Sequence, residues 1–477
     1  MSKNCSVNRR SFLMTSLAAG VVARAQLPPR RVLILGAGLA GLSAGWELDR
    51  AGYDVTILEA RTRPGGRVYT LREPFSDGLY AEAGAGRIQD SHEFTLRFVK
   101  EFNLTLDPFW PTEGANVTYV RGKRILTPAG TPPNLNDIPL NFSPEERALG
   151  LGGSLQKYIF SSVEALGDPD KAGWPGADLK KFEVSIPDFL RQKGASEGLI
   201  QMVALGHDLG GMSMLQFLRD ASTAAKTRMW YKIRGGNDQL PKAFAAKLAD
   251  RIVYGSPVVR IEQDDRSVRA ICLRAGIPLP VTADFMICAL PLPVMRRLEM
   301  APAWSAAKRA AIYEVDYVPM ARVFLQSRRR FWLERGETGW ASTDQPMDVW
   351  DYTRGQPGKR GILGAYTSGR MALELTYRDH SERTRFVLER MEPVHPGILE
   401  SFEGSASHSW VTDPWSLGAA AEFKQGQLST HYPNLRTPEG RVFFAGEHTS
   451  TWSAWMNGAI DSGLRAAKEI RERVPAV

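Results

Sequence analysis

The stretch Gly36-Ala37-Gly38-Leu39-Ala40-Gly41 constrains the fold more than any other feature of this chain. It follows an apolar run of strand type, Arg31–Leu35, and opens a helical stretch that reaches about Ala51; a second strand, Val55–Leu58, ends at Glu59. The first glycine permits a tight turn, the second lets a pyrophosphate approach the backbone, and the third lets helix and strand pack closely. The acid 23 residues past Gly36 can accept hydrogen bonds from ribose hydroxyls. We therefore predict a Rossmann-type βαβ unit that binds a dinucleotide.

Two other catalytic patterns are rejected. Gly41-Leu42-Ser43-Ala44-Gly45 matches the G-x-S-x-G nucleophile elbow, but it falls inside the first helix and not at a strand-to-helix turn. Ser43 is therefore predicted to pack, not to attack a substrate. The seven histidines show no metal-ligand spacing, so no metal site is predicted.

Residues 1–25 have the pattern of a twin-arginine export signal. Arg9 and Arg10 precede an apolar run to Val22, and Ala23-Arg24-Ala25 offers small residues for cleavage. The apolar run is too short to cross a hydrocarbon core of ~30 Å, so no stable membrane insertion is expected. A frayed N-terminal helix is the alternative interpretation. We expect the mature protein to be periplasmic or secreted.

The positive charge does not indicate a nucleic-acid partner. The formal net charge is +8, but four of the 60 basic residues and none of the 52 acidic ones lie in residues 1–25. The remaining basic residues are scattered along the chain and form no stripe. We expect a small-molecule substrate and no nucleic acid.

Two further segments predict ligand contacts far apart in the chain. Arg63-Pro64-Gly65-Gly66-Arg67 indicates a second phosphate-contacting turn, with both arginines available for charge-assisted hydrogen bonds. Near the carboxyl end, the strand Arg441–Ala445 runs into Gly446-Glu447, and residues 452–463 open a last helix whose N-terminus can stabilise negative charge. The ligand-binding domain is therefore predicted to be assembled from distant segments.

These segments resemble the FAD-dependent amine oxidases, a family that includes monoamine, polyamine and L-amino acid oxidases. The resemblance covers both ends of the chain and two short middle segments, 233–240 and 255–261, whereas residues of about 100–227 and 335–405 show little of it. It implies non-covalent FAD, because Ala419 stands where the covalent monoamine oxidases carry a cysteine. The cofactor-binding residues that it implies are Gly36, Gly38, Ala40, Gly41, Glu59, Ala60, Arg61, Gly66, Arg67, Gly84, Ala85, Gly86, Val258, Gly446, Glu447, Met456 and Ala459.

Some of these residues receive specific roles from the resemblance. Glu59 would bind the adenosine ribose, and Val258 would make a backbone contact to adenine. Arg61 and Arg67 would lie along the cofactor, with Glu447 at its centre. Met456 would supply a backbone N–H near a flavin carbonyl.

Arg87 is the residue that discriminates best between substrates. L-amino acid oxidases have an arginine here that holds the substrate carboxylate, whereas monoamine oxidases have an aromatic or apolar residue. A guanidinium matches a carboxylate with two parallel hydrogen bonds; an ion pair or a contact with FAD phosphate is the alternative. The resemblance places the Tyr366 hydroxyl on the same carboxylate, although a tyrosine of the strand core remains open. Trp455 would lie over the substrate face of the flavin, and the small Ala420 opposite it leaves room for an amino acid.

Arg322 departs from the family pattern. It stands ten residues before Trp332, where these oxidases usually hold a lysine near flavin N5 through water. Arginine keeps the charge but is not deprotonated in proteins. The acceptor could therefore be O2 or a quinone-type compound, and oxidase and dehydrogenase both stay open.

The predicted architecture is a mixed α/β flavoprotein with two domains. The Rossmann-type FAD-binding domain would collect residues 26–90, 228–300 and 425–473, and a substrate-binding domain with a sheet and helices would contain 91–227 and 301–424. The predicted reaction is oxidative deamination of an L-amino acid to a 2-oxo acid and ammonia, by hydride transfer to flavin N5, with H2O2 formed if O2 is the acceptor. The alternatives are a monoamine or polyamine oxidase, a flavin desaturase and a non-catalytic flavin-binding protein. A homodimer is one assembly open to the chain.

Overall fold

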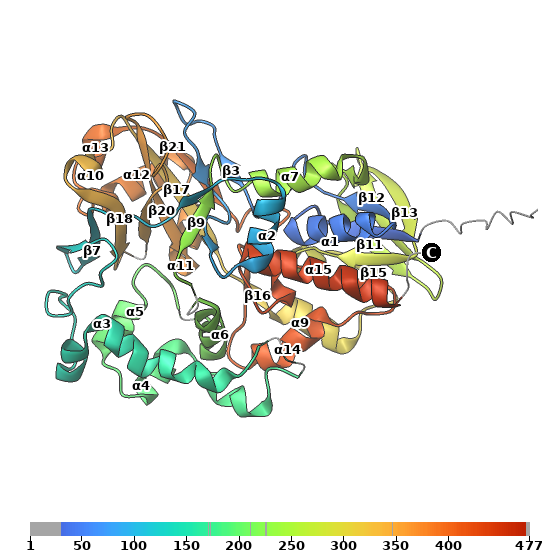
Figure 1. Cartoon of the computed structure of the whole chain (residues 1–477), viewed down its shortest axis with the longest axis horizontal. Coiled ribbons are helices and arrows are strands. Elements are labelled where there is room, and N and C mark those ends of the chain that lie inside the picture. Colours follow the sequence, from blue (N-terminus) through green and yellow to red (C-terminus); the bar gives the residue numbers. More distant parts are fainter. Residues whose placement is uncertain are drawn as a thin grey trace, which may run out of the picture.

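The computed structural model describes residues 30–473, apart from residues 170, 172, 210, 225–226 and 346. The predicted export signal, residues 1–25, lies outside these residues. The described chain is a mixed α/β protein built around two large sheets, as the sequence predicted (Figure 1). No helix within the described ranges combines the length and apolar character needed to cross a bilayer. Cys272 and Cys288 are both buried free thiols.

The first sheet is parallel and contains the predicted βαβ unit. β1 pairs with β2 on one side and β14 on the other, so the strand order changes direction at β1. Such a switch point creates a ligand-binding crevice at the carboxyl ends of the strands. α1 and α15 pack side by side along this sheet, although they lie at opposite ends of the sequence (Figure 1). The strand order is β10 (Ile252–Val253), β2 (Asp54–Leu58), β1 (Arg31–Leu35), β14 (Phe285–Cys288) and β23 (Val442–Phe444), with α1 at Leu39–Arg50 and α15 at Met456–Arg473.

The second sheet has seven strands, most of them antiparallel. Helices α11 (Gly369–Thr376) and α12 (His380–Met391) pack against it. Phe324, Trp340, Trp350 and Tyr352 form an aromatic cluster on it with residues that follow the βαβ unit. The strand order is β21 (Phe402–Ser409), β17 (Met320–Ser327), β20 (Gly361–Ser368), β19 (Asp348–Asp351), β18 (Glu337–Thr343), β7 (Ala115–Val120) and β8 (Lys123–Pro128).

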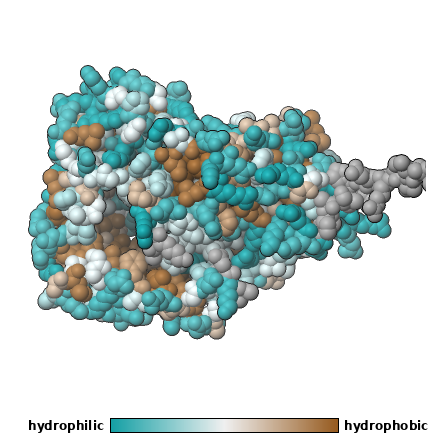
Figure 2. Space-filling model, in the orientation of Figure 1, coloured by the Kyte–Doolittle hydropathy of each residue, from teal (hydrophilic) through white to brown (hydrophobic). Residues whose placement is uncertain are grey.

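Smaller sheets and a helical region complete the molecule. The small sheets contain β3 (Thr70–Leu71) with β4 (Ala81–Glu82); β5 (Ile88–Gln89), β9 (Trp230–Ile233) and β6 (Leu106–Pro108); β13 (Ile277–Ala283), β12 (Val268–Arg274), β11 (Val258–Gln263) and β15 (Glu299–Ala301); and β16 (Asp316–Tyr317) with β22 (Ala421–Glu422). The other helices are α2 (Glu93–Glu101), α3 (Pro144–Tyr158), α4 (Ile186–Gln192), α5 (Glu197–Val203), α6 (Met214–Ala224), α7 (Gln239–Lys247), α8 (Leu292–Met295), α9 (Ala306–Glu314), α10 (Phe331–Glu334), α13 (Ile398–Ser401) and α14 (Gln427–Arg436). Apolar residues gather around a hollow between the seven-stranded sheet and the helices α3–α5 (Figure 2).

The predicted domain limits do not follow the packing everywhere. α2 belongs to the predicted substrate segment 91–227, but it packs on α15, and the Thr95 N–H donates to Asn457 Oδ1 at 3.0 Å. Conversely, Phe75 and Leu79, from the predicted FAD segment 26–90, pack with the aromatic cluster of the seven-stranded sheet. The chain therefore interleaves the two regions, and the exact division stays a prediction.

Candidate functional site

The residues predicted from the sequence converge on one pocket at the carboxyl ends of the parallel strands. All of the predicted cofactor and substrate residues line it except Gly41, which lies behind the wall. The pocket has a volume of about 370 Å³. Its wall runs from Gly36 and Gly38 of the βαβ turn to Arg322 and Tyr366 on the seven-stranded sheet, so one pocket adjoins both the predicted cofactor site and the predicted substrate site.

The βαβ end of the pocket can hold an anion and a ribose. α1 begins after Gly38 with no side-chain cap and no acid in its first turn, so its free N–H groups face the pocket. Glu59 is 5% exposed, and its carboxylate accepts the N–H groups of Ala37 and Arg61 at 2.7 and 2.8 Å. Burial raises the pKa of Glu59, and these two hydrogen bonds act against that rise. The arrangement fits a dinucleotide at this end.

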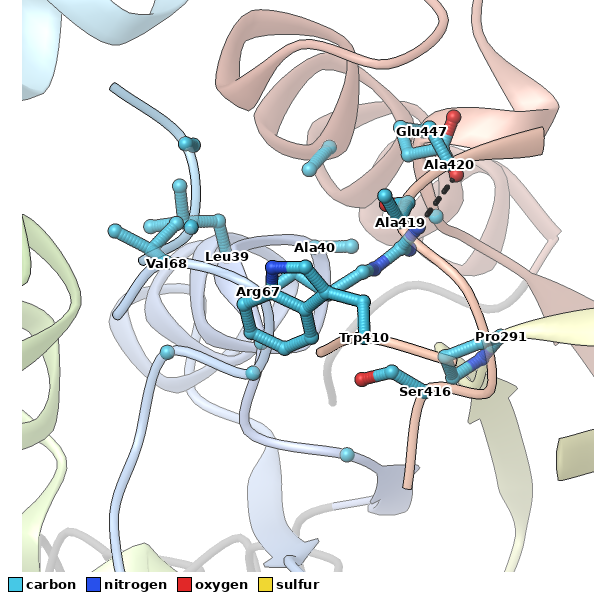
Figure 3. Close-up of a pocket in the computed structure, with 18 of the residues that line it drawn as sticks. Leu39, Ala40, Arg67, Val68, Pro291, Trp410, Ser416, Ala419, Ala420 and Glu447 are labelled. Carbon is cyan, nitrogen blue, oxygen red and sulfur yellow. Dashed lines mark hydrogen bonds and ion pairs between the residues drawn. The ribbon is translucent and has the colours of Figure 1, made fainter. Parts of the chain in front are cut away.

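An ion pair between Arg67 and Glu447 braces the middle of the pocket (Figure 3). Its N–O distance is 2.8 Å, and Arg67 also donates to the carbonyl of Ala419. The Glu447 carboxylate accepts the N–H groups of Ala421 and Ala454 at 3.2 and 2.9 Å. Burial raises the pKa of Glu447, but Arg67 and the hydrogen bonds hold it below its ordinary value. Glu447 is thus an anion that holds together the three wall segments that contain Arg67, Ala421 and Ala454.

Arg61 and Arg63, which precede Arg67 in the same segment, have different partners. Arg61 lines the pocket and forms a bidentate pair with Asp413, with N–O distances of 2.9 and 2.6 Å. Arg63 does not line it: its guanidinium donates to the carbonyls of Pro64 and Gly66 and stacks on Tyr69. Arg63 therefore stabilises its own loop, and its predicted phosphate contact stays a prediction.

Arg87 enters the pocket between aromatic rings. Its guanidinium carbon lies 4.9 Å from the ring centre of Trp350, 5.3 Å from Trp230 and 5.6 Å from Trp455. No described residue forms a hydrogen bond or an ion pair with the guanidinium. Burial lowers the pKa of Arg87, and Tyr366 and the carboxylate of Asp348, which lies beyond ion-pair distance, act against that fall. Cation–π contacts offset part of the cost of burying this charge, but they do not replace an anionic partner. Arg87 is therefore a cation ready to bind an anion in the pocket.

Tyr366 and Arg322 lie side by side on the sheet face beside Arg87. They are cross-strand partners on β20 and β17, and the Arg322 guanidinium carbon is 4.6 Å from the Tyr366 ring centre. Tyr366 stacks on Trp350 at 4.4 Å. Arg322 Nη1 donates to the carbonyls of Glu82 and Gly84, so it clamps the loop that carries Arg87.

The family model described as flavin containing amine oxidoreductase matches residues 39–471 of this chain. The chain belongs to the flavin-containing amine oxidoreductases. It is thus a flavin-dependent oxidoreductase, and membership implies a flavin cofactor.

Relatives within this amine oxidoreductase family extend over nearly the whole chain. YobN of Bacillus subtilis (strain 168), provisionally named an L-amino-acid oxidase, is 33% identical over 460 residues, which cover 94% of this chain and 95% of YobN. The L-amino-acid oxidase BmooLAAO-I of Bothrops moojeni is 28% identical over 456 residues, covering 93% and 89% of the two chains.

Solved structures of amine oxidases share the fold. Putrescine oxidase bound to putrescine superimposes with a TM-score of 0.80 at 21% identity, covering 93% of this chain and 99% of its own. Cyclohexylamine oxidase from Brevibacterium oxydans IH-35A gives a TM-score of 0.81 at 22% identity, with coverage of 94% and 100%. These likenesses confirm the predicted fold of this amine oxidoreductase.

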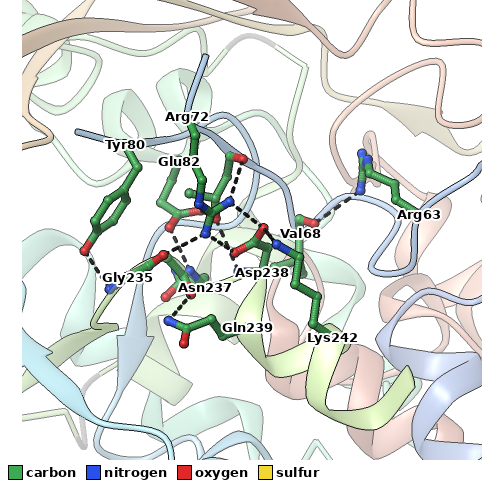
Figure 4. A network of polar contacts seen from close by, with 12 residues as sticks. Arg63, Val68, Arg72, Tyr80, Glu82, Gly235, Asn237, Asp238, Gln239 and Lys242 are labelled. Atoms are coloured by element: carbon green, nitrogen blue, oxygen red, sulfur yellow. Dashed lines mark hydrogen bonds and ion pairs between the residues drawn. The ribbon is translucent and has the colours of Figure 1, made fainter. Parts of the chain in front are cut away.

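The middle motif that resembled the amine oxidase family supports the pocket from behind (Figure 4). The Asn237 amide donates to the carbonyl of Ala85 at 2.9 Å, its N–H donates to the Glu82 carboxylate at 2.8 Å, and its Oδ1 accepts the N–H of Ile233. Asn237 is fully buried and does not line the pocket. It therefore fixes the loop from Glu82 to Arg87, whose other side is held by Arg322.

Several wall residues of this amine oxidoreductase were missed by sequence reasoning. Trp350 and Trp410 come from the seven-stranded sheet and its margin, Ala289–Pro291 follow β14, and Asp220 comes from α6. A signal existed for Ala289–Pro291, because a buried apolar strand ends directly before them and parallel strands end at ligand sites. Nothing local marks the other three. Among the described residues, no group of three or more histidine, cysteine, aspartate or glutamate side chains is arranged to hold a metal.

Proposed function

We propose that the protein catalyses FAD-dependent oxidative deamination of an L-amino acid. The observation that carries this proposal is the Arg87 guanidinium, which lies in the pocket among aromatic rings and forms no hydrogen bond or ion pair with a described residue. An amine substrate would leave that charge uncompensated, whereas an amino acid brings the matching carboxylate. The relatives named as L-amino-acid oxidases support the same substrate class.

In this proposal the protein supplies orientation and a dry site. Arg87 binds the substrate carboxylate in a bidentate manner, with the Tyr366 hydroxyl as a second donor. Trp350 and Trp455 exclude water and strengthen these contacts. Arg322 cannot act as a base, because arginine stays protonated, so the amine is taken to arrive neutral. Bound FAD would supply the oxidation by accepting a hydride from the substrate Cα, and the imino acid would hydrolyse to a 2-oxo acid and ammonia.

We further propose that FAD is bound without a cysteinyl link. Ala419 lies on the pocket wall, and the two described cysteines lie in β12 and β14, off the wall. Acid precipitation should release all yellow colour into the supernatant, whereas colour in the pellet would contradict a non-covalent site. Export of the folded protein through residues 1–25 is likewise a proposal, and replacing Arg9 and Arg10 by lysine should keep the protein in the cytoplasm.

The experiment that tests the reaction is anaerobic mixing of the FAD-loaded protein with pairs of L-amino acids and their decarboxylated amines. Amino acids should bleach the flavin and amines should not. Arg87→Ala should abolish this difference, and the matched variant Arg87→Lys should restore only part of it, because lysine cannot form the bidentate fork. Faster bleaching by the amines would refute the proposal and favour a monoamine or polyamine oxidase. Admitting air then distinguishes an oxidase from a dehydrogenase.

A further inference from the structure

One charged wall residue has no part in the proposed reaction. Asp220 lies on α6 and lines the same pocket as Arg87 and Trp455, and 27% of its side-chain surface is exposed there. Glu59 and Glu447, the other carboxylates on the wall, are engaged by backbone N–H groups. Asp220 is thus the wall carboxylate with no main-chain hydrogen-bond donor among the described contacts.

Its neighbour Arg219 holds the Asp220 carboxylate from the protein side. Arg219 Nε and Nη2 donate to Asp220 Oδ1 at 3.1 and 3.0 Å. The Arg219 side chain is completely buried and faces the ring of Phe423 at 6.0 Å, so it does not reach the pocket. Burial raises the pKa of Asp220, and Arg219 and a hydrogen bond with Gln216 act against that rise. A ligand in the pocket would therefore meet the carboxylate of Asp220 and not the guanidinium of Arg219.

Asp220 reaches the pocket wall where α6 packs beside β22. α6 is joined to the segment after β22 by the Phe423 N–H, which donates to Gln216 Oε1 at 2.7 Å. β22 directly follows Ala420, which also lines the pocket. The resemblance places Ala420 across the flavin from Trp455, so under the proposed function Asp220 lies toward the substrate.

We propose that Asp220 binds the cationic side chain of the substrate, so that the enzyme prefers L-amino acids with a terminal amine or guanidine. This inference rests on the proposed function, in which Arg87 takes the carboxylate at the other end of the same molecule. A cationic side chain donates charge-assisted hydrogen bonds to Asp220. An apolar side chain of equal length would remove water from that carboxylate and return no hydrogen bond. The pocket therefore attracts one class and rejects the other.

A binding experiment without turnover tests this directly. 6-Aminohexanoate and hexanoate lack the α-amine, differ only in the terminal amine, and can be titrated into the FAD-loaded protein while the flavin absorption is followed. We expect 6-aminohexanoate to bind about tenfold more tightly or better. Asp220→Asn should bring the two affinities together, and Asp220→Glu, which keeps the charge, should preserve part of the difference. Equal affinities in the unmodified protein would overturn the proposal, whatever the variants do.

Turnover separates this inference from the proposed function. L-lysine should bleach the flavin with a kcat/KM about tenfold above that of L-norleucine, and Asp220→Asn should remove this ratio. If norleucine and lysine bleach equally well, the side-chain assignment fails but amino acid oxidation stands. If neither bleaches while simple amines do, the proposed function itself fails. Loss of FAD from Asp220→Asn with an unchanged ratio would place Asp220 against the cofactor and overturn the proposal.

Discussion

Two glycines of the βαβ turn should respond differently to replacement by alanine. Gly38 has φ −73° and ψ 172°, a conformation open to alanine, and an added Cβ meets no atom within 4 Å. Gly41 differs, because a Cβ there would lie 2.0 Å from the carbonyl oxygen of Gly36. The first substitution projects a methyl group into the cofactor's space, and the second forces α1 away from β1.

The expected magnitudes follow from these contacts. Gly38→Ala should change the stability of the FAD-free protein by less than ~1 kcal/mol, because alanine restricts the unfolded chain but is a poorer N-cap residue for α1 than glycine. Gly41→Ala should destabilise the FAD-free protein by about 1–3 kcal/mol or more, the usual cost of overpacking. Gly38→Ala should nevertheless lose most of its FAD, because the pyrophosphate needs close approach to this backbone.

The assay combines thermal unfolding of the FAD-free protein with FAD content after desalting. Gly38→Ala should separate the two measurements by losing FAD with little change in stability, whereas Gly41→Ala should lower both. The reasoning is refuted if Gly38→Ala retains FAD like the unmodified protein. It is also refuted if Gly38→Ala destabilises the FAD-free protein as much as Gly41→Ala does.

Three further substitutions test other parts of the structure. Glu447→Gln should cost ~3–5 kcal/mol in thermal unfolding and release FAD, because it leaves Arg67 buried without its partner. The control is Glu374→Gln, which breaks a surface ion pair and should cost under ~1 kcal/mol. Burial lowers the pKa of Lys308 to about 7 from 10.5, so the folded state binds fewer protons than the unfolded one between these pH values. The free energy of unfolding of the unmodified protein, relative to that of Lys308→Met, should therefore rise by up to ~1.4 kcal/mol per pH unit from pH 7 to 10. Denaturant titrations at several pH values measure this difference, and a difference that does not change with pH would contradict the prediction. Ser43→Ala should leave flavin reduction unchanged in anaerobic mixing, because Ser43 is fully buried and bonded to the carbonyls of Ala40 and Ile460.

The sequence predicted those parts of the site in which neighbouring residues determine the geometry. The βαβ unit was located to within one residue at β1 and β2, because the glycines, the helix and the terminal acid must follow one another at fixed spacings. Glu59 receives its hydrogen bonds from Ala37 and Arg61, both close to it in sequence. The mixed α/β fold with a discontinuous parallel sheet followed from the same local patterns.

Partners that depend on distant segments could not be predicted. Arg63 differs from Arg67 only in what surrounds it: Arg67 meets Glu447, 380 residues away, whereas Arg63 turns to its own loop. Asp220 lies in a region with little family resemblance, and only the packing of α6 beside β22 brings it to the wall. Side-chain partners of this kind are set by tertiary packing, on which local propensity says nothing.

The loop from Glu82 to Arg87 is held in place by two distant parts of the chain. Arg322 holds its carbonyls from the seven-stranded sheet, and Asn237 holds it from the motif between β9 and α7. With its backbone fixed on both sides and aromatic rings around its head, Arg87 has little freedom to reach a counter-ion elsewhere in the protein. A flexible arginine would find a surface carboxylate at small cost, whereas under the proposed function this one is held in place for the substrate carboxylate. The fixed loop therefore also explains why Arg87 forms no ion pair with the protein. Asn237→Ala, which loosens this loop, should weaken carboxylate binding although Asn237 does not line the pocket.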